Sequence, residues 1–179
     1  MPVQFPAGYA LAQLTRSHPR ERFDSGVSEV NEWLKTKARQ AQKKHLSVTR
    51  VLLNEEKAIA GFYTLAIGQI NLDSLPARFA RGLPRTMLPI VTLAWLGVDS
   101  KQQGKGLGRR LLASALGDCF QTGQQVPFVA VVLDCLNERA KRFYQRFDFQ
   151  ELPGHPMKLF LPWTLLEKMM ETEGVDTQG

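Results

Sequence analysis

The sequence predicts a mixed α/β domain, and the order of its residue patterns is the main reason. Strand-like apolar runs dominate the first half of the chain, most clearly over residues 47–53 and 58–71. The second half alternates strand and helix patterns, beginning with the apolar run 88–98. The 179 residues suit one domain, and no repeat or long linker divides them. We expect the domain to span residues 1–170 and a flexible polar tail to span 171–179.

The N-terminal part is expected to hold a strand, a turn and a long helix. Residues 9–14 have a strand pattern, and Phe23-Asp24-Ser25-Gly26 has the side chains of a capped turn. Over residues 28–45, apolar side chains recur at spacings of three and four, which predicts an amphipathic helix. Acidic residues in its first turn and lysines in its last turn suit the helix dipole. The expected buried face consists of Val30, Trp33, Leu34, Ala38 and Ala41.

A hairpin and a series of alternating elements follow this helix. The strands 47–53 and 58–71 are joined by the polar turn 54–57, which predicts a hairpin. Residues 73–84 form an arginine-rich connection that can contain a short helix, and 88–98 is apolar and branched enough for a central strand. The remaining expected elements are helices at 107–120, 137–147 and 164–170 and strands at 128–133 and 157–161.

Composition and charge argue against several classes of protein. The chain is 44% hydrophobic and 22% charged, as is typical of a globular protein, and its net charge of +6 favours an anionic partner. It shows no signal-peptide pattern and no run of about 18 apolar residues, so we expect a cytoplasmic protein without membrane contact. Cys119 and Cys135 lack metal-ligand spacing, so we expect buried free thiols and no metal site.

Three glycines, Gly104, Gly106 and Gly108, fall between the strand 88–98 and the helix that follows. Glycine permits a tight turn and a close approach of the backbone to a ligand. The N–H groups of such a turn, with a helix N-terminus behind them, can bind a pyrophosphate. A Walker A loop is absent, and the GxGxxG fingerprint fails because Arg109 replaces its last glycine. A glycine turn without a ligand remains the alternative.

This loop matches the pattern [QR]xxGx[GA] through Gln103, Gly106 and Gly108, and it thereby resembles the coenzyme A loop of the GNAT acetyltransferases. The resemblance implies a GNAT fold, with a mostly antiparallel central sheet that is splayed at the acetyl-CoA site by a bulge in the preceding strand. Acetyl-CoA would be the acetyl donor. The residues that the resemblance assigns to acetyl-CoA are Leu96, Val98, Gln103, Gly104, Lys105, Gly106, Leu107, Gly108, Arg109 and Asn137.

The segment 137–144 resembles the second coenzyme A helix of the family, and this assigns Tyr144 as the general acid. A phenol with a pKa of about 10 can protonate a departing thiolate whose thiol has a pKa of about 8.5. From spacing alone, a core tyrosine would be favoured, and Asn137 equally suits a helix N-cap. The family usually has a glycine where Asp148 stands, so we expect Asp148 to adopt a left-handed C-cap conformation at some cost.

Basic residues gather in two segments that flank the acceptor cleft of the GNAT fold. Two such clusters suit a phosphate backbone, although a solvated helix face explains any one of these side chains taken singly. The candidates for nucleic-acid binding are Lys35, Lys37, Arg39, Lys43 and Lys44 in the first helix and Arg78, Arg81 and Arg85 in the connection.

Over residues 10–162 the chain resembles the GNAT toxins of type II toxin–antitoxin pairs, through 23–26, 30–34, 98–99 and the glycine loop. The resemblance implies acetylation of the α-amine of an aminoacyl-tRNA, which blocks translation. This amine has a pKa of about 7.7–8.0, against about 10.4 for lysine, so it needs no strong general base, and we identify none. A ribbon-helix-helix antitoxin and a possible homodimer are also implied.

Two other functions remain open from the sequence. The first is a GNAT enzyme that acetylates a small amine or a protein N-terminus. The second is a GNAT-shaped RNA-binding module that has lost catalysis, against which the intact glycine loop and Tyr144 argue.

Overall fold

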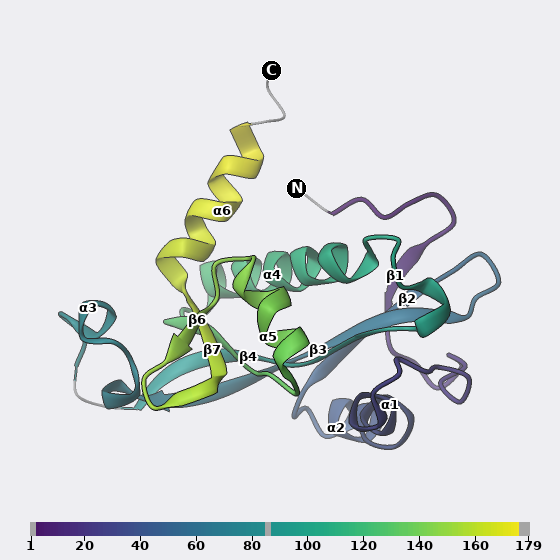
Figure 1. Ribbon diagram of the computed structural model, residues 1–179, viewed down its shortest axis with the longest axis horizontal. Coiled ribbons are helices and arrows are strands. Elements are labelled where there is room, and N and C mark those ends of the chain that lie inside the picture. Colours follow the sequence, from purple (N-terminus) through teal and green to yellow (C-terminus); the bar gives the residue numbers. More distant parts are fainter. Residues whose placement is uncertain (1–2, 85–86, 176–179) are drawn as a thin grey trace. The chain divides into compact units, whose positions relative to one another are not determined.

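The computed structural model describes residues 3–84 and 87–175 and has the predicted mixed α/β architecture (Figure 1). Its seven strands are ordered β1-β2-β3-β4-β5-β7-β6 in one sheet, in which β4 and β5 are parallel and the other described ladders are antiparallel. The strands are β1 (Ala10–Gln13), β2 (Val48–Leu53), β3 (Ile59–Asn71), β4 (Met87–Val98), β5 (Ala130–Asp134), β6 (Gln150–Leu152) and β7 (His155–Pro162).

The long helices lie at the positions expected from the sequence, whereas β2 and β3, and β6 and β7, are joined by turns without a helix. None of the helices within the described residues is long and apolar enough to cross a membrane. The helices are α1 (Ser28–Glu32), the π-helix η1 (Trp33–Lys37), α2 (Ala38–Lys43), the 3-10 turns η2 (Leu72–Ser74) and η3 (Ser100–Gln102), α3 (Ala77–Ala80), α4 (Leu107–Gln125), α5 (Glu138–Gln145) and α6 (Trp163–Val175).

The chain divides into two compact units. The N-terminal unit consists of residues 2–66 and 93–117, and the C-terminal unit of residues 67–92 and 118–179 together with residue 1. The strands β3 and β4 and the helix α4 each contribute residues to both units. That residues 1–170 act as one domain therefore stays a prediction, as does the flexible tail.

In the N-terminal unit, helices lie on both faces of the antiparallel strands β1, β2 and β3 (Figure 1). A Cβ on Gly97 would lie 2.6 Å from Cγ1 of Val30 in α1, and a Cβ on Gly61 would lie 2.6 Å from Cδ1 of Leu111 in α4. Both glycines are therefore needed for close packing of the helices on the sheet. The rings of Phe23 and Phe62 meet edge to face at 5.4 Å in this core.

The predicted helix over residues 28–45 is correct in extent but contains the π-turn η1, which its periodicity did not reveal. In a regular α-helix, positions four apart drift by about 40° per step around the axis. The wider π-turn offsets that drift, so that Val30, Leu34 and Ala38 all remain buried, whereas Trp33 and Ala41 are only partly buried.

The helical run ends in a Schellman motif. His45 adopts a left-handed conformation (φ 58°), its N–H donates to the Gln42 carbonyl, and the N–H of Leu46 donates to the Ala41 carbonyl.

In the C-terminal unit, β5 pairs with β4 on one side and with β7 on the other, and β6 pairs with β7. The short strand β6 was missed by the sequence analysis, because three residues carry no readable periodicity. The helix α6 continues to Val175, beyond the predicted end at residue 170.

Cys119 and Cys135 are buried free thiols, as predicted, and burial raises the pKa of Cys119 to about 12.

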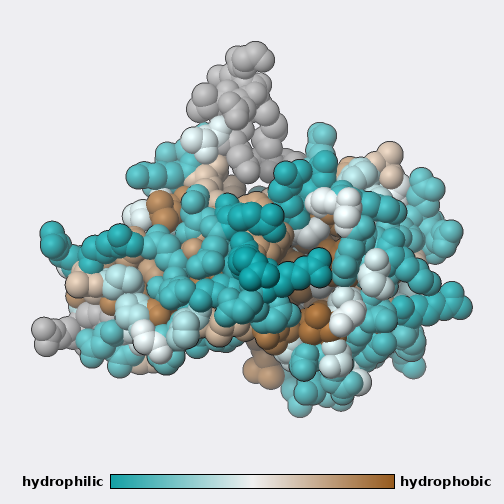
Figure 2. All heavy atoms as spheres, viewed as in Figure 1, coloured by the Kyte–Doolittle hydropathy of each residue, from teal (hydrophilic) through white to brown (hydrophobic). Residues whose placement is uncertain are grey.

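Hydrophilic side chains cover most of the face that Figure 2 shows, with apolar side chains visible between them. This is the surface expected of a globular protein, so overall polarity does not mark a functional site.

Candidate functional site

The loop after β4 is fixed to the rest of the N-terminal unit by Asp99. The Oδ1 of Asp99 accepts a hydrogen bond from the N–H of Lys101 at 2.9 Å, and its Oδ2 accepts one from the N–H of Asp24 at 3.1 Å. The backbone N–H of Asp99 donates to the Ala60 carbonyl of β3. Asp99 is buried, and its hydrogen bonds connect the loop, the turn before α1 and the sheet. This structural role was not predicted from the sequence.

The glycine loop has the backbone that its sequence predicts. Gly104 and Gly106 lie in the left-handed region, with φ of +81° and +75°. Within the described part of the chain, the N–H groups from Gly104 to Arg109 donate no hydrogen bond to another protein group. The first amides of α4 lack intrahelical acceptors, and the helix dipole is positive at this end. Loop and helix therefore present a set of free donors that suits a pyrophosphate.

The side chains of the loop divide into supporting and exposed groups. Gln103 donates from Nε2 to the carbonyls of Ser25 and Val98, both at 3.1 Å, so it holds the loop against its surroundings. The side chain of Leu107 is buried, which leaves its backbone N–H as the group that can meet a ligand. The exposed candidates in the loop are Lys105, whose Nζ donates to Gln102 Oε1 at 3.0 Å, and Arg109.

The strand β4 extends beyond its ladder with β5. Its ladder with β5 covers Ile90–Thr92 and ends there, although β4 continues to Val98. Leu96 and Val98, predicted to meet the acetyl-CoA arm through their backbone, lie in this second half and are partly exposed. The fold thus has the mostly antiparallel sheet that was expected, whereas the bulge that splays the fourth strand stays a prediction.

Tyr144 lies on α5 in the C-terminal unit and is 8% exposed. Its ring meets Phe143 and Phe149 edge to face, at centroid distances of 5.2 and 5.8 Å. Burial, with a smaller contribution from Cys135, raises the pKa of Tyr144 above its ordinary value, so the phenol stays protonated at neutral and mildly alkaline pH. The hydroxyl is therefore in the protonated form that a proton donor requires.

Asn137 caps the helix that carries Tyr144. Its Oδ1 accepts a hydrogen bond from the N–H of Ala140 at 2.8 Å, which confirms the N-cap prediction. The amide NH₂ of Asn137 is not used in this cap, so the side chain retains donors for a ligand.

Asp148 takes the left-handed conformation that its position required, with φ of +66°. Glycine adopts this region at little steric cost, whereas an aspartate is strained there. We expect Asp148→Gly to raise the free energy of unfolding by about 0.5–1 kcal/mol. Thermal or urea unfolding of the two proteins checks this, and an unchanged or lowered stability would contradict it.

The predicted basic residues lie in both units. In the N-terminal unit, Lys37, Lys43 and Lys44 are exposed, and Lys35 and Arg39 are partly buried. In the C-terminal unit, Arg78 and Arg81 are exposed, whereas Arg85 lies outside the described residues.

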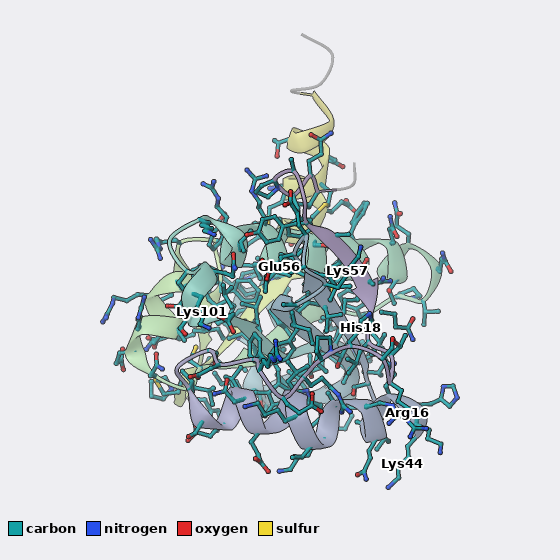
Figure 3. The ribbon with its side chains drawn as sticks, turned by 90° about the vertical axis from the view of Figure 1, so that its right-hand side faces the viewer. Arg16, His18, Lys44, Glu56, Lys57 and Lys101 are labelled. Carbon is teal, nitrogen blue, oxygen red and sulfur yellow. The ribbon has the colours of Figure 1, made fainter. Side chains whose placement is uncertain are left out.

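Arg16, Arg20 and Arg22, which follow β1, add to the positive charge of the N-terminal unit. These arginines were not among the predicted nucleic-acid-binding residues, although three arginines within seven residues were a readable signal. Arg20 donates from Nη1 to the Lys35 carbonyl at 3.3 Å, which joins this segment to the helix. In Figure 3, Arg16 and Lys44 project in the same direction. The segment after β1 and the end of α2 therefore offer positive charge to one side of this unit.

Comparison with known proteins also supports an acetyltransferase site of the GNAT type. A family model described as an acetyltransferase (GNAT) domain matches residues 51–151. A tRNA-acetylating toxin of Mycobacterium tuberculosis (strain ATCC 25618 / H37Rv) is 33% identical over 139 residues, which cover 78% of this chain and 82% of that protein.

Solved structures of one toxin, AtaT, share the fold. AtaT complexed with acetyl-methionyl-tRNAfMet is 26% identical with a TM-score of 0.84, and the match covers 90% of this chain and 99% of that one. A structure of AtaTR bound with AcCoA is 27% identical with a TM-score of 0.81, and the match covers 91% and 98% of the two chains.

Proposed function

This chain belongs to the GNAT acetyltransferase family, and we propose that it transfers the acetyl group of acetyl-CoA to the α-amine of an aminoacyl-tRNA. The observation that carries the proposal is the loop of free amides at the N-terminus of α4. The 33% identity to a tRNA-acetylating toxin supports the choice of acceptor. The AtaT structures with acetyl-methionyl-tRNAfMet and with AcCoA support both substrates.

The donor half of the reaction rests on the loop and the second half of β4. The amides from Gly104 to Gly108 hold the pyrophosphate of acetyl-CoA, and Lys105 and Arg109 add positive charge beside it. The backbone groups of Leu96 and Val98 orient the acyl arm along the part of β4 that has no ladder with β5 among the described residues. Acetyl-CoA supplies an activated thioester.

The chemical step is an aminolysis. The neutral α-amine attacks the acetyl carbonyl, the new C–N bond forms, and the C–S bond breaks with the electron pair leaving on sulfur. Tyr144 donates its phenolic proton to this sulfur, the proton lost by the amine passes to solvent, and Tyr144 regains a proton from solvent before the next turnover. An α-amine with a pKa of about 7.7–8.0 is already partly neutral near pH 7.5, so the reaction requires no dedicated base.

The acceptor tRNA is bound mainly through its negative charge. Exposed lysines and arginines that bind phosphates release counterions, so binding weakens as salt rises. We expect Lys44→Glu to weaken binding of charged tRNA and to reduce the slope of log affinity against log salt by about one or more. Binding titrations at several salt concentrations measure this.

The hairpin residue Lys57 provides a matched control for that variant. It is exposed in the same unit, and Figure 3 shows it apart from Lys44. Lys57→Glu makes the same charge change and is expected to leave the slope nearly unchanged. Equal losses in the two variants would show that only net charge matters, and would contradict a localised RNA surface.

Incubation with labelled acetyl-CoA and three acceptors tests the proposed function. The acceptors are total charged tRNA, a mixture of free amines, and peptides with free N-termini. We expect label in the charged tRNA fraction that is released by mild alkaline hydrolysis of the aminoacyl ester. Label in free amines or peptides instead would favour an ordinary small-amine or N-terminal acetyltransferase. Tight tRNA binding with no label anywhere would favour a non-catalytic RNA-binding module.

Partners follow from the proposed function. A protein that blocks translation needs an inhibitor, and we propose a ribbon-helix-helix antitoxin whose acidic or apolar tail covers the basic surface. We also propose that the chain acts in the cytoplasm, where charged tRNA is found, and that it forms a homodimer. Sedimentation of the purified chain checks the dimer, and co-expression with its genomic neighbour checks the antitoxin.

A further inference from the structure

Two tryptophans form a parallel stack in the N-terminal unit. Trp33 opens the π-helix η1 and Trp95 lies in β4, and their ring centroids are 5.5 Å apart with an angle of 13° between the planes. Both side chains are partly buried against the core of this unit and partly exposed. At this centroid distance the parallel rings are offset-stacked, one of the arrangements that aromatic pairs prefer, so the feature that sets this pair apart is its partial exposure beside basic side chains.

A buried polar chain fixes the orientation of this pair. Trp33 donates from Nε1 to Thr64 Oγ1 at 3.0 Å, and Thr64 Oγ1 is 2.7 Å from Thr49 Oγ1. Both threonines are fully buried. Gln42 completes the arrangement, because its Oε1 accepts from the N–H of Thr49 and its Nε2 donates to the Leu14 carbonyl.

This polar chain holds the indole of Trp33 in one orientation before any ligand arrives. Buried hydroxyls are costly unless they are hydrogen-bonded, so the chain is a constraint that an apolar core would not need. A preorganised ring loses little conformational entropy when it binds another flat group.

The pair lies beside both halves of the proposed reaction. Trp95 directly precedes Leu96, in the half of β4 that has no ladder with β5 among the described residues. Trp33 begins the π-helix that also carries Lys35 and Lys37. Flat aromatic rings next to basic side chains are the combination that binds single-stranded nucleic acid, through stacking of bases and pairing with phosphates.

We propose that the Trp33–Trp95 stack is the platform on which the terminal nucleobase of the acceptor RNA stacks. This inference rests on the proposed function, because in an aminoacyl-tRNA the terminal ribose carries both the aminoacyl ester and the last base, an adenine. A surface that binds this base therefore lies within one nucleotide of the reacting amine. Lys35 and Lys37 meet the phosphate that precedes it. The stack thus positions the amine at the acetyl group.

Tryptophan fluorescence tests this without catalysis. The chain has three tryptophans, so Trp163→Phe leaves a signal from the pair alone. With coenzyme A at saturation to fill the donor site, adenosine 5′-monophosphate is expected to quench this signal saturably, whereas ribose 5-phosphate is not. Absence of quenching by adenosine 5′-monophosphate, or equal quenching by both compounds, would overturn the proposal.

Kinetics of Trp95 variants provide the second test. Trp95→Leu keeps an apolar side chain but removes the flat ring, and we expect it to raise the KM for charged tRNA about ten- to a hundredfold. The KM for acetyl-CoA should stay constant. Trp95→Phe, which retains a ring, should recover most of the loss. Equal KM values for the leucine and phenylalanine variants would contradict stacking.

The two tests separate this proposal from the proposed function. If the pair binds adenosine 5′-monophosphate but charged tRNA is never acetylated, the assignment of the substrate fails while the base platform stands. If charged tRNA is acetylated and neither quenching nor the change in KM is seen, the platform fails alone.

Discussion

Replacement of Tyr144 by phenylalanine is expected to lower kcat by about 10²–10⁴-fold while leaving the affinity for acetyl-CoA nearly unchanged. Phenylalanine keeps the ring contacts with Phe143 and Phe149 and removes only the proton donor. The departing sulfur must then leave as a thiolate or take its proton from water. Because burial raises the pKa of Tyr144, its ionisation should not limit kcat in the wild type between pH 6 and about 10.

Steady-state kinetics and calorimetric titration with coenzyme A measure these effects. Tyr63→Phe is the matched control, since Tyr63 is also a buried tyrosine and its hydroxyl lies 3.3 Å from Ser114 Oγ. This control is expected to change stability modestly and to leave kcat near the wild-type value. A Tyr144→Phe protein with full kcat would remove Tyr144 from the mechanism.

The second large effect is expected at the glycine loop. Gly106 has φ of +75°, where a β-branched side chain is strongly disfavoured, so Gly106→Val should displace the backbone that presents the loop amides. We expect the affinity for acetyl-CoA to fall about tenfold or more, which corresponds to about 1.4 kcal/mol. Calorimetry with coenzyme A measures the loss directly.

The turn between β6 and β7 provides the control for backbone strain. Gly154 has φ of +77°, and a Cβ there would meet nothing within 4 Å, so Gly154→Val imposes a comparable strain away from the loop. We expect it to lower stability and to preserve acetyl-CoA affinity. If both valine variants bound coenzyme A as the wild type does, the loop amides would not be the pyrophosphate site.

Local chemistry was predicted well from the sequence. The N-cap role of Asn137 and the left-handed conformation of Asp148 are confirmed, because each depends on a residue and its immediate neighbours. The glycine loop is confirmed in its backbone, with Gly104 and Gly106 both at positive φ. Such features follow from the steric limits of single residues, and these are present in the sequence itself.

Contacts between distant residues were not predictable in the same way. The side-chain amide of Gln103 donates to the Ser25 and Val98 carbonyls, and the assignment of this residue to acetyl-CoA stays a prediction. The lack of a Cβ on Gly97 leaves room for Val30. The Trp33–Trp95 stack joins residues that are far apart in the chain. Each of these depends on which elements the fold brings together, and no local pattern records that.

The most direct test of the account is mass spectrometry of tRNA 3′ ends. Total charged tRNA is incubated with the protein and acetyl-CoA, then digested to nucleosides, so that each amino acid remains attached to its terminal adenosine. The account predicts N-acetylaminoacyl-adenosine, formed at least about a hundredfold more slowly with the Tyr144→Phe protein. Unmodified aminoacyl-adenosine, with acetyl groups found on free amines or proteins, would contradict it.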